Sequence, residues 1–338
     1  MSNPLRIGLL LVVSCFINSH AAEEASVFRS TDEGRSWARS DRGLSRAARV
    51  NAFASIGDSV LAGTDSGIFI SKDQGLSWRP CGGVAGSSGR VIALAALGNK
   101  LFAGTDRSGI LESPDQGMIW AANKTFPCKS VRSLLGYDRK LLVGTDDKGM
   151  FVSVDHGVSW EQSRAGLPHG AQVLALAVVK GKVFAGLYSQ GLYSLDDQTG
   201  RWSKIGPVSP LVLAAIGDTL VVGHNPGGIY TSDDLGKTWS KATSSGFANL
   251  SLLNPVPGGE LSGDAPIWEL AASSGSVFAG AGSGIYYSED KGRSWTRARE
   301  GLPEECPGVA FLLSEDLVLA ATFKRVADQS EGRASLSR

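Results

Sequence analysis

Three arginines are the residues of this chain best suited to binding an anion. Arg49, Arg90 and Arg132 each stand at or next to the beginning of an apolar run. A guanidinium matches the geometry of a carboxylate and can bind it through two parallel hydrogen bonds. The spacing therefore indicates a clamp for an anionic group. The alternative is that each arginine pairs with a nearby aspartate and has a structural role.

Three aspartates directly follow threonines at the ends of apolar runs: Asp65, Asp106 and Asp146. Hydrolysis of a glycosidic bond uses two carboxyl groups, one as the acid and one as the base or nucleophile. Each of these aspartates also stands shortly before a glycine, a pattern typical of a turn in which the aspartate accepts a backbone hydrogen bond. The residues alone allow both interpretations.

Two histidines and one tryptophan complete the set of candidate binding residues. His169 and His224 are expected on the same face of adjacent repeat units, but two histidines without a third ligand do not predict a metal site. Trp268 stands one position inside its apolar run, as Arg132 does, and offers an aromatic surface to a ligand. We expect neither a metal nor a cofactor.

A repeated octet, Ser-x-Asp-x-Gly-x-x-Trp, indicates the strands and turns that position these residues. Six copies begin at Ser30, Ser71, Ser113, Ser153, Ser232 and Ser288, and a seventh, from Ser194 to Trp202, has one extra residue. Seven of the eight tryptophans of the chain lie in these octets. A period of about 42 residues is typical of a β-propeller blade.

Each octet has the composition of a tight turn that leads into a buried strand. The aspartate can accept backbone hydrogen bonds, the glycine can adopt positive φ, and the tryptophan buries a large ring. We therefore expect a structural role for Asp32, Asp73, Asp115, Asp155, Asp196, Asp234 and Asp290, and for Trp37, Trp78, Trp120, Trp160, Trp202, Trp239 and Trp295.

The rest of each unit is predicted to form four short strands. In the second unit, strand A covers 50–56, strand B 60–63 and strand C 68–71, and strand D lies around Trp78. Short Gly-Asp or Gly-Asn pairs between apolar runs are typical of hairpins.

Both ends of the chain are needed to complete one blade. The first octet is preceded only by residues 26–29, enough for one strand, whereas 308–313 and 317–322 match strands A and B. Sharing a blade in this way closes the ring and removes exposed sheet edges. We predict an all-β, seven-bladed propeller over residues 26–323, followed by a polar C-terminal tail at 324–338.

The octet resembles the Asp box, or BNR repeat, of sialidases, xyloglucanases, sortilin-type receptors and the photosystem II assembly factor family. The resemblance implies that the box is a structural turn on the rim of a blade. The sialidase Phe-Arg-Ile-Pro motif is absent, and no tyrosine has an obvious glutamate partner. Xyloglucanases of this superfamily use two propellers, and this chain has one. The assembly factor family implies a platform for other proteins.

In a propeller, the A–B and C–D turns share one face, and the B–C and D–A connections share the other. The octets are C–D turns, so all nine candidate binding residues are expected on the opposite face: Arg49, Arg90, Arg132, Asp65, Asp106, Asp146, His169, His224 and Trp268. The long connection 240–266 belongs to that face too. It is expected either to bind a partner or to pack passively on the rim.

The first 21 residues have the pattern of a signal peptide. Arg6 precedes an apolar stretch at 7–17, and small residues follow at Ser19 and Ala21. Eleven apolar residues are too few to span a membrane but suit the core of a signal peptide. The alternative is a lipoprotein signal with lipidation at Cys15. We expect export, to the periplasm or outside the cell, and no membrane span.

Composition excludes some classes of partner. The chain has 33 basic and 33 acidic residues among 338, so it lacks the excess positive charge of a dedicated nucleic-acid binder.

Three cysteines remain after the signal peptide: Cys81, Cys128 and Cys306. We expect buried thiols, and one disulfide among the three is the alternative. A monomer is expected.

Two functions fit these observations. The first is an exported, non-catalytic propeller that presents a binding or assembly platform to a protein or a glycan. The second is a glycoside hydrolase, sialidase-like or xyloglucanase-like, on the same fold. Fold alone does not choose between them.

Overall fold

A computed structural model describes residues 23–45, 48–83, 89–224, 227–242, 266–273, 275–304, 306–314 and 316–325. The expected signal peptide, Cys15, the tail beyond residue 325 and most of the 240–266 connection lie outside these ranges. Over the part of the chain that is described, there is no helix with the length and apolar character needed to cross a membrane.

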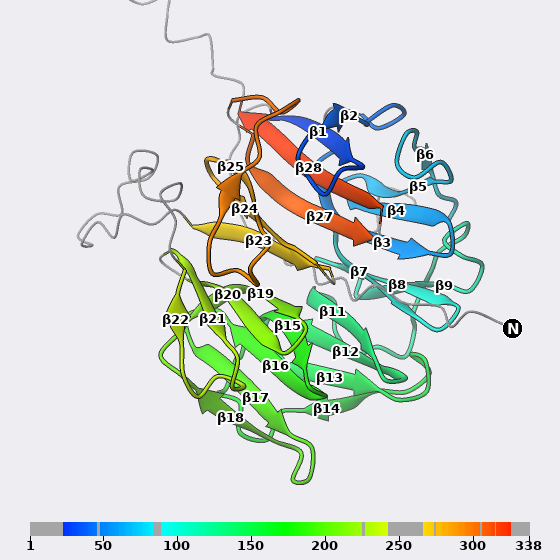
Figure 1. Cartoon of the computed structure of the whole chain (residues 1–338). Coiled ribbons are helices and arrows are strands. Elements are labelled where there is room, and N and C mark those ends of the chain that lie inside the picture. Colours follow the sequence, from blue (N-terminus) through cyan, green and yellow to red (C-terminus); the bar gives the residue numbers. More distant parts are fainter. Residues whose placement is uncertain are drawn as a thin grey trace, which may run out of the picture.

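Seven antiparallel sheets of four strands stand in a ring (Figure 1). Blade 1 contains β27 (Gly308–Ser314), β28 (Leu317–Arg325), β1 (Glu23–Ser30) and β2 (Ala38–Arg39). Blade 2 contains β3 (Val50–Ile56), β4 (Ser59–Thr64), β5 (Gly67–Ser71) and β6 (Arg79–Pro80). Blade 3 contains β7 (Val91–Leu97), β8 (Lys100–Thr105), β9 (Ile110–Ser113) and β10 (Ala121–Ala122). These strands are strands A, B, C and D of each blade, in that order.

The remaining four blades have the same order. Blade 4 contains β11 (Val131–Tyr137), β12 (Lys140–Thr145), β13 (Met150–Ser153) and β14 (Glu161–Ser163). Blade 5 contains β15 (Val173–Val179), β16 (Lys182–Leu187), β17 (Gly191–Asp196) and β18 (Arg201–Ile205). Blade 6 contains β19 (Pro210–Ile216), β20 (Thr219–His224), β21 (Ile229–Ser232) and β22 (Ser240–Lys241). Blade 7 contains β23 (Ile267–Ala272), β24 (Val277–Ala281), β25 (Gly284–Ser288) and β26 (Thr296–Arg297).

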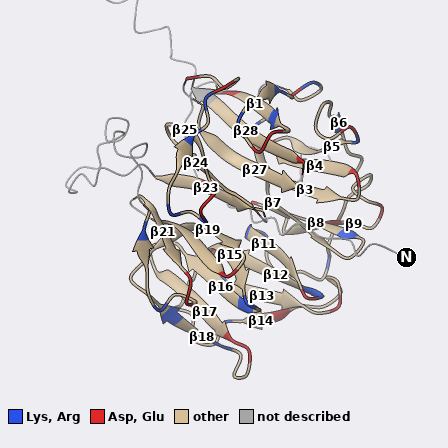
Figure 2. Cartoon of the chain, viewed as in Figure 1, with Lys and Arg blue, Asp and Glu red and all other residues tan. Residues whose placement is uncertain are grey.

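Hydrophobic burial decreases from the A strands to the D strands. Nearly every residue of β7 and β15 is buried, because each A strand packs against the neighbouring blades as well as its own sheet. The short D strands are mostly exposed. Figure 2 shows the consequence: acidic and basic residues gather in the turns and at strand ends, around strands that are largely uncharged.

Glycines on the B strands set how closely adjacent blades approach. A Cβ on Gly63 would stand 2.5 Å from Val91 Cγ1 in the next blade. On Gly280 it would collide with the backbone carbonyl of Gly308. Real side chains do not tolerate such contacts, so a glycine at this position lets the next A strand pack directly on the sheet.

The chain ends close the ring as predicted. β1 pairs with β28 from Glu23 opposite Arg325 to Ser30 opposite Val318, and β28 pairs in turn with β27. This confirms a seven-bladed propeller whose first blade is built from both termini. Burial of Val27 and Leu319 in one hydrophobic cluster ties the two ends together.

Candidate functional site

A β-bulge begins strand A in every blade and determines which side chain reaches the face of the B–C connections. The register between strands A and B shifts around one residue that has no cross-strand partner. Bulges re-aim side chains in this way. The residues at this position are Asn51, Ile92, Arg132, Leu174, Leu211, Trp268 and Val309. Two of the nine candidate residues, Arg132 and Trp268, therefore occupy equivalent sites.

Arg132 holds the aspartate of its own blade in a bidentate ion pair. Its Nε and Nη2 donate to the two carboxylate oxygens of Asp146, at 3.0 and 2.8 Å. Gln172, at the beginning of the next blade, donates to Asp146 Oδ1 at 2.8 Å. The Arg132 side chain is 11% exposed, so the pair is largely shielded from water. Such pairs are stronger and more rigid than single ion pairs at the surface.

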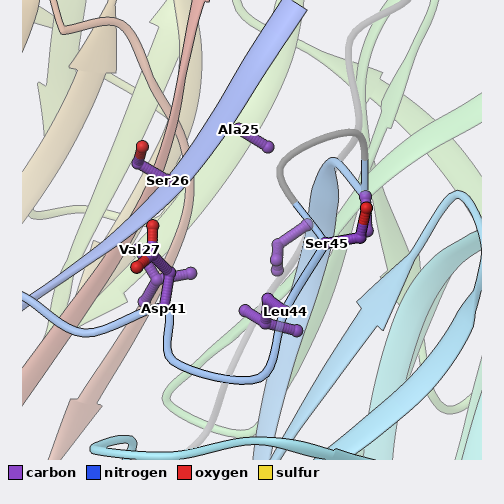
Figure 3. A pocket seen from close by; sticks show the side chains of 8 residues that line it. Ala25, Ser26, Val27, Asp41, Leu44 and Ser45 are labelled. Atoms are coloured by element: carbon purple, nitrogen blue, oxygen red, sulfur yellow. The ribbon is translucent and has the colours of Figure 1, made fainter.

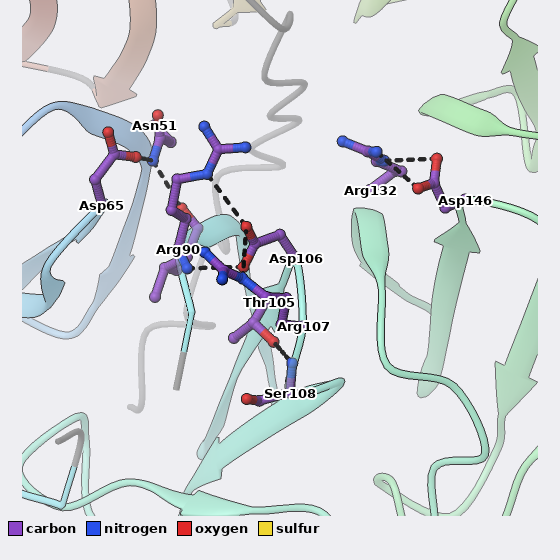
Figure 4. A network of polar contacts seen from close by, with 10 residues as sticks. Asn51, Asp65, Arg90, Thr105, Asp106, Arg107, Ser108, Arg132 and Asp146 are labelled. Carbon is purple, nitrogen blue, oxygen red and sulfur yellow. Dashed lines mark hydrogen bonds and ion pairs between the residues drawn. The ribbon is translucent and has the colours of Figure 1, made fainter. Parts of the chain in front are cut away.

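Blade 3 repeats the arrangement with a different arginine. Asp106 accepts hydrogen bonds from the backbone N–H of Arg90 at 2.9 Å and from its Nε at 3.3 Å. The exposed Arg107 lies 3.5 Å from the same carboxylate. In blade 2 an amide replaces the guanidinium: Asn51 donates to Asp65 at 2.7 Å and to the carbonyl of Val91 in the next blade at 3.1 Å (Figure 4).

The threonines before these aspartates form the turns themselves. Thr64, Thr105 and Thr145 each donate a hydroxyl hydrogen bond to the carbonyl of the glycine that ends the turn, at 2.8–2.9 Å. The hydroxyl also accepts a backbone N–H within the turn. The Thr-Asp pairs thus serve two tasks: the threonine shapes the loop, and the aspartate binds the strand A residue.

Arg49 has a different neighbour. Its guanidinium carbon lies 4.7 Å from the centre of the Phe323 ring, a cation–π contact. Trp268 stacks on the same ring, with centroids 5.8 Å apart and an angle of 21°. In blade 1, Phe323 takes the place of an aspartate. The equivalent residues of blades 2–4 are Asp65, Asp106 and Asp146. Blades 7, 1 and 2 are therefore joined here by an aromatic stack with an arginine at its end.

The two histidines are not brought into a common cluster with a third ligand. His224 accepts a hydrogen bond from the backbone N–H of Ser209 at its Nδ1, at 2.9 Å, and packs edge-on against Tyr230. His169 is exposed in the connection before blade 5. Among the described residues, no three His, Cys, Asp or Glu side chains gather as a metal site would require.

The face of the B–C connections, here called the B–C face, is divided by charge. The B–C loops of blades 2–4 carry Asp65, Asp106, Arg107, Asp146, Asp147 and Lys148. The described B–C loop residues of blades 5 and 7 are Tyr188, Ser189, Gln190, Gly282 and Ser283, which are uncharged. Tyr188 is 50% exposed. A ligand on this face would meet ordered charges over blades 2–4 and uncharged B–C loops over blades 5 and 7.

A small pocket lies beside the closing blade. It is a shallow depression that encloses almost no volume, and it is lined by Ala25, Ser26, Val27, Asp41, Leu44, Ser45, Ala48 and Val50 (Figure 3). Pockets for small-molecule ligands usually measure roughly 300–1,000 Å³. This one is too small for a sugar chain or a cofactor.

The opposite face carries the octets, and six of the seven share the same internal hydrogen bonds. In blade 2, the Ser71 hydroxyl donates to Asp73 and accepts the Gly75 N–H at 2.7 Å, and Asp73 accepts the Ser77 N–H at 2.8 Å. The fourth residue, Gln74, has φ of 56° and the glycine after it 85°. Two successive residues with positive φ explain why the fifth position is glycine in six of the octets.

Hydrogen bonds to the octet aspartates stabilise their charged form. Those from Ser36, above all from its hydroxyl, lower the pKa of Asp32 to about 2. The hydroxyls of Ser71 and Ser77 do the same for Asp73, which also has a pKa of about 2. The fifth octet differs: Asp196 accepts the N–H groups of Gln198 and Thr199 in a plain hairpin turn. The other six aspartates are bound by the serine that begins their octet.

Six of the seven octet tryptophans donate a hydrogen bond from the indole. The acceptor is the glycine carbonyl of the same octet for Trp37, Trp120, Trp239 and Trp295. Trp78 donates to Ser40 and Trp202 to Ser163, both in the preceding blade. Trp160 has no acceptor among the described residues and packs edge-on against Phe126.

The octets also match a known repeat. The model of the BNR/Asp-box repeat matches residues 230–241, which contain the complete octet Ser232–Trp239. The fold is a seven-bladed β-propeller, and one of its octets matches the Asp-box repeat. No curated protein matches the sequence of this propeller.

Solved structures share the fold at low sequence identity. YCF48 bound to D1 peptide superposes with a TM-score of 0.62 at 16% identity, over 94% of this chain and 100% of that one. The GH74 xyloglucanase from Xanthomonas campestris gives 0.59 at 18%, over 94% of this chain and 59% of that one. The extracellular domain of BT4673 from B. thetaiotaomicron gives 0.63 at 17%, over 85% and 40%. At these identities the likeness concerns the fold alone.

Several residues of the B–C face were not singled out by sequence reasoning. Asn51 and Phe323 take positions equivalent to an arginine and an aspartate of other blades, so their role depends on register rather than on residue type. Gln172 contacts an aspartate of the preceding blade. Aligning the repeats around the bulge would have identified all three.

The described cysteines, Cys81, Cys128 and Cys306, are free thiols. Burial raises the pKa of Cys81 and of Cys306 to about 11, and raises that of Cys128 as well. Thiols with raised pKa are poor nucleophiles. Cys306 is buried as expected, whereas Cys81 and Cys128 are only partly buried, and the three form no disulfide with one another.

Proposed function

We propose that this propeller is an exported, non-catalytic platform that binds a protein partner on the B–C face over blades 2–4. The observation that carries the proposal is the bidentate pair of Arg132 and Asp146, with Gln172 on the same carboxylate. The pair fixes charged groups on a rigid sheet edge, and electrostatic complementarity of that kind gives specificity to protein recognition.

The hydrogen bonding of the aspartates favours recognition over hydrolysis. A glycosidase needs one carboxyl group that donates a proton to the leaving oxygen. Asp146 accepts hydrogen bonds at both oxygens, and Asp106 does so as well. Carboxylates held in this manner serve as acceptors that orient arginines. A folded structure similar to this one carries a D1 peptide, which by analogy supports a peptide-containing partner.

Export is part of the proposal and rests on the first 21 residues of the sequence. Sequencing the N-terminus of the native protein tests it: a chain that begins near Ala22 supports cleavage, and one that still begins at Met1 contradicts it. Lipid on Cys15 would instead establish the lipoprotein alternative.

Affinity capture with the mature chain tests the binding face. The bait is the wild-type protein, compared with an Arg90→Ala, Arg132→Ala double variant and with an Arg35→Ala, Arg293→Ala control on the octets. We expect the double variant alone to lose the partner. Equal recovery by all three baits would contradict the assignment to this face. A panel of chromogenic glycosides tests the hydrolase alternative, because turnover by the wild type would overturn the non-catalytic proposal.

A further inference from the structure

The octets of three consecutive blades expose large apolar side chains. Val154 is 68% exposed, Val158 63%, Ile119 61%, Leu76 55% and Met118 39%. All five lie in the octets of blades 2–4, on the face opposite the proposed binding site. We call these five residues the apolar arc. Isolated exposed apolar residues are ordinary, but a group of them on one face marks an interaction surface.

Ion pairs elsewhere on this face show how neighbouring octets meet. Arg35, the sixth residue of the blade 1 octet, lies 3.2 Å from Glu289, the second residue of the blade 7 octet. Arg293 and Asp233 are 2.8 Å apart and occupy the same two positions in blades 7 and 6. The sixth residue of one octet therefore faces the second residue of the octet before it.

The same register applies to the octets of blades 2–4. Met118 of blade 3 takes the place of Arg35 and faces the position of Lys72, and Val158 of blade 4 faces that of Pro114. Blades 6, 7 and 1 thus join their octets with ion pairs, whereas the sixth octet residues of blades 2, 3 and 4 are Leu76, Met118 and Val158. The residues of the arc therefore follow one another over the octets of three neighbouring blades.

Ile119 lies at the centre of the arc, at the seventh octet position, where other blades have a residue with a hydroxyl group. In blades 1, 2, 4, 6 and 7 the seventh residue is serine or threonine, and its hydroxyl donates to the octet aspartate. In blade 3, Ile119 offers Asp115 only its backbone N–H, at 3.0 Å. A residue that breaks the pattern of the repeat without a structural benefit is expected where the position has a function.

The arc is self-complementary about blade 3. The seventh octet residues of blades 2, 3 and 4 are Ser77, Ile119 and Ser159. The residues that follow the octet tryptophans are Arg79, Ala121 and Glu161, all exposed. A two-fold axis that runs radially through blade 3 would place blade 2 of one copy on blade 4 of the other. Arg79 would then face Glu161 twice, and Ile119 would meet its own counterpart.

We propose that two copies of this chain associate face to face through the apolar arc, about that two-fold axis. An isologous contact of this kind requires one patch that complements itself in shape and charge. The order basic, neutral, acidic over blades 2, 3 and 4 meets the charge requirement. This proposal departs from the monomer expected at the sequence level. It leaves both B–C faces free on the outside, so it does not depend on the proposed function.

Sedimentation analysis of the mature chain over a range of concentrations tests the dimer. We expect the wild type to dimerise and Ile119→Lys to raise the dissociation constant at least about tenfold, because it buries two unpaired charges at the axis. Lys237→Glu, at the sixth position of the blade 6 octet, is the matched control and should have little effect. A wild type that remains monomeric at all concentrations overturns the proposal.

A charge exchange distinguishes this two-fold from other modes of association. Arg79→Glu and Glu161→Arg should each weaken the dimer, since each places like charges opposite one another. The double variant R79E/E161R restores opposite charges across the axis and should recover wild-type association. Failure of the double variant to recover, with its circular dichroism unchanged, would overturn the proposed geometry.

Discussion

Arg132 on β11 and Asp146 in the turn after β12 share two hydrogen bonds, of 3.0 and 2.8 Å. The bulge at the start of β11 points the arginine onto the B–C face, and the turn after β12 presents the aspartate to it. The pair therefore joins the bulge at the start of strand A, which recurs in every blade, to the Thr-Asp turn, which recurs in blades 2–4. Both hydrogen bonds join side chains, and the Arg132 side chain is only 11% exposed.

Removal of the aspartate should destabilise the fold measurably. Asp146→Ala leaves the largely buried guanidinium of Arg132 without its carboxylate, and such a loss typically costs about 1–3 kcal/mol. Chemical denaturation would measure the change. Arg107→Ala is the control, since Arg107 is 76% exposed and its contact with Asp106 should contribute less than about 0.5 kcal/mol. Equal effects of the two substitutions would contradict the structural importance of the pair.

Acid should unfold the propeller through its octets. Asp32, Asp73, Asp155 and Asp234 have pKa values of about 2 in the folded protein, below the ordinary 3.8, because hydroxyl and backbone groups donate to them. A lowered pKa contributes stability that is fully present above pH 3.8 and disappears as the pH falls towards 2. The melting temperature should therefore fall steeply between pH 4 and pH 2.

A single substitution separates this effect from general acid denaturation. Asp155→Asn should lower the melting temperature at pH 6 and make it less sensitive to acid. An unchanged acid profile in this variant would show that the octet aspartates do not govern the transition.

Blade spacing should depend on the glycines of the B strands. Gly280→Ala would force a methyl group into the carbonyl of Gly308, a backbone atom that cannot rotate away. Overpacking of this kind costs about 1–3 kcal/mol. Gly275→Ala is a matched control, because nothing lies within 4 Å of the added atom. Thermal unfolding should show a clear loss of stability for Gly280→Ala only; equal melting temperatures would refute the close approach.

Closure of the ring should require the last strand. Deletion of 317–323 removes the strand that joins β27 to β1, and with it the pairing of both chain ends. We expect the melting temperature to fall by more than roughly 10 °C, since several kcal/mol of pairing and burial are lost. Deletion of 326–338 serves as the control and should leave it unchanged. A small shift in the first variant would mean that the ring is stable without closure.

The repeat made most of the fold predictable from the sequence. The octets indicated where turns occur, and the incomplete first unit indicated that residues 308–322 complete blade 1. Both conclusions follow from local chemistry and counting. Extension of β28 to Arg325 could not be deduced in this way, because it depends on pairing with Glu23 at the other end of the chain.

The proposed binding face was predictable only in part. The arginines and the Thr-Asp pairs were visible as residue types, but their partners depend on the bulge and on contacts between blades. Arg49 illustrates the limit: its residue type suggests an anion, and its neighbour is the ring of Phe323. The long connection at 240–266 was singled out for its length, and most of it lies outside the described residues.

Photo-cross-linking in the native host tests most directly where a partner binds on the surface. A photo-reactive amino acid replaces Arg107 on the B–C face in one variant and Lys237 on an octet in another, and both are irradiated in the native host. We predict an adduct with a different protein from position 107 and none from position 237. Adducts from position 237 alone would contradict the claim that this propeller binds a protein through the charged half of its B–C face.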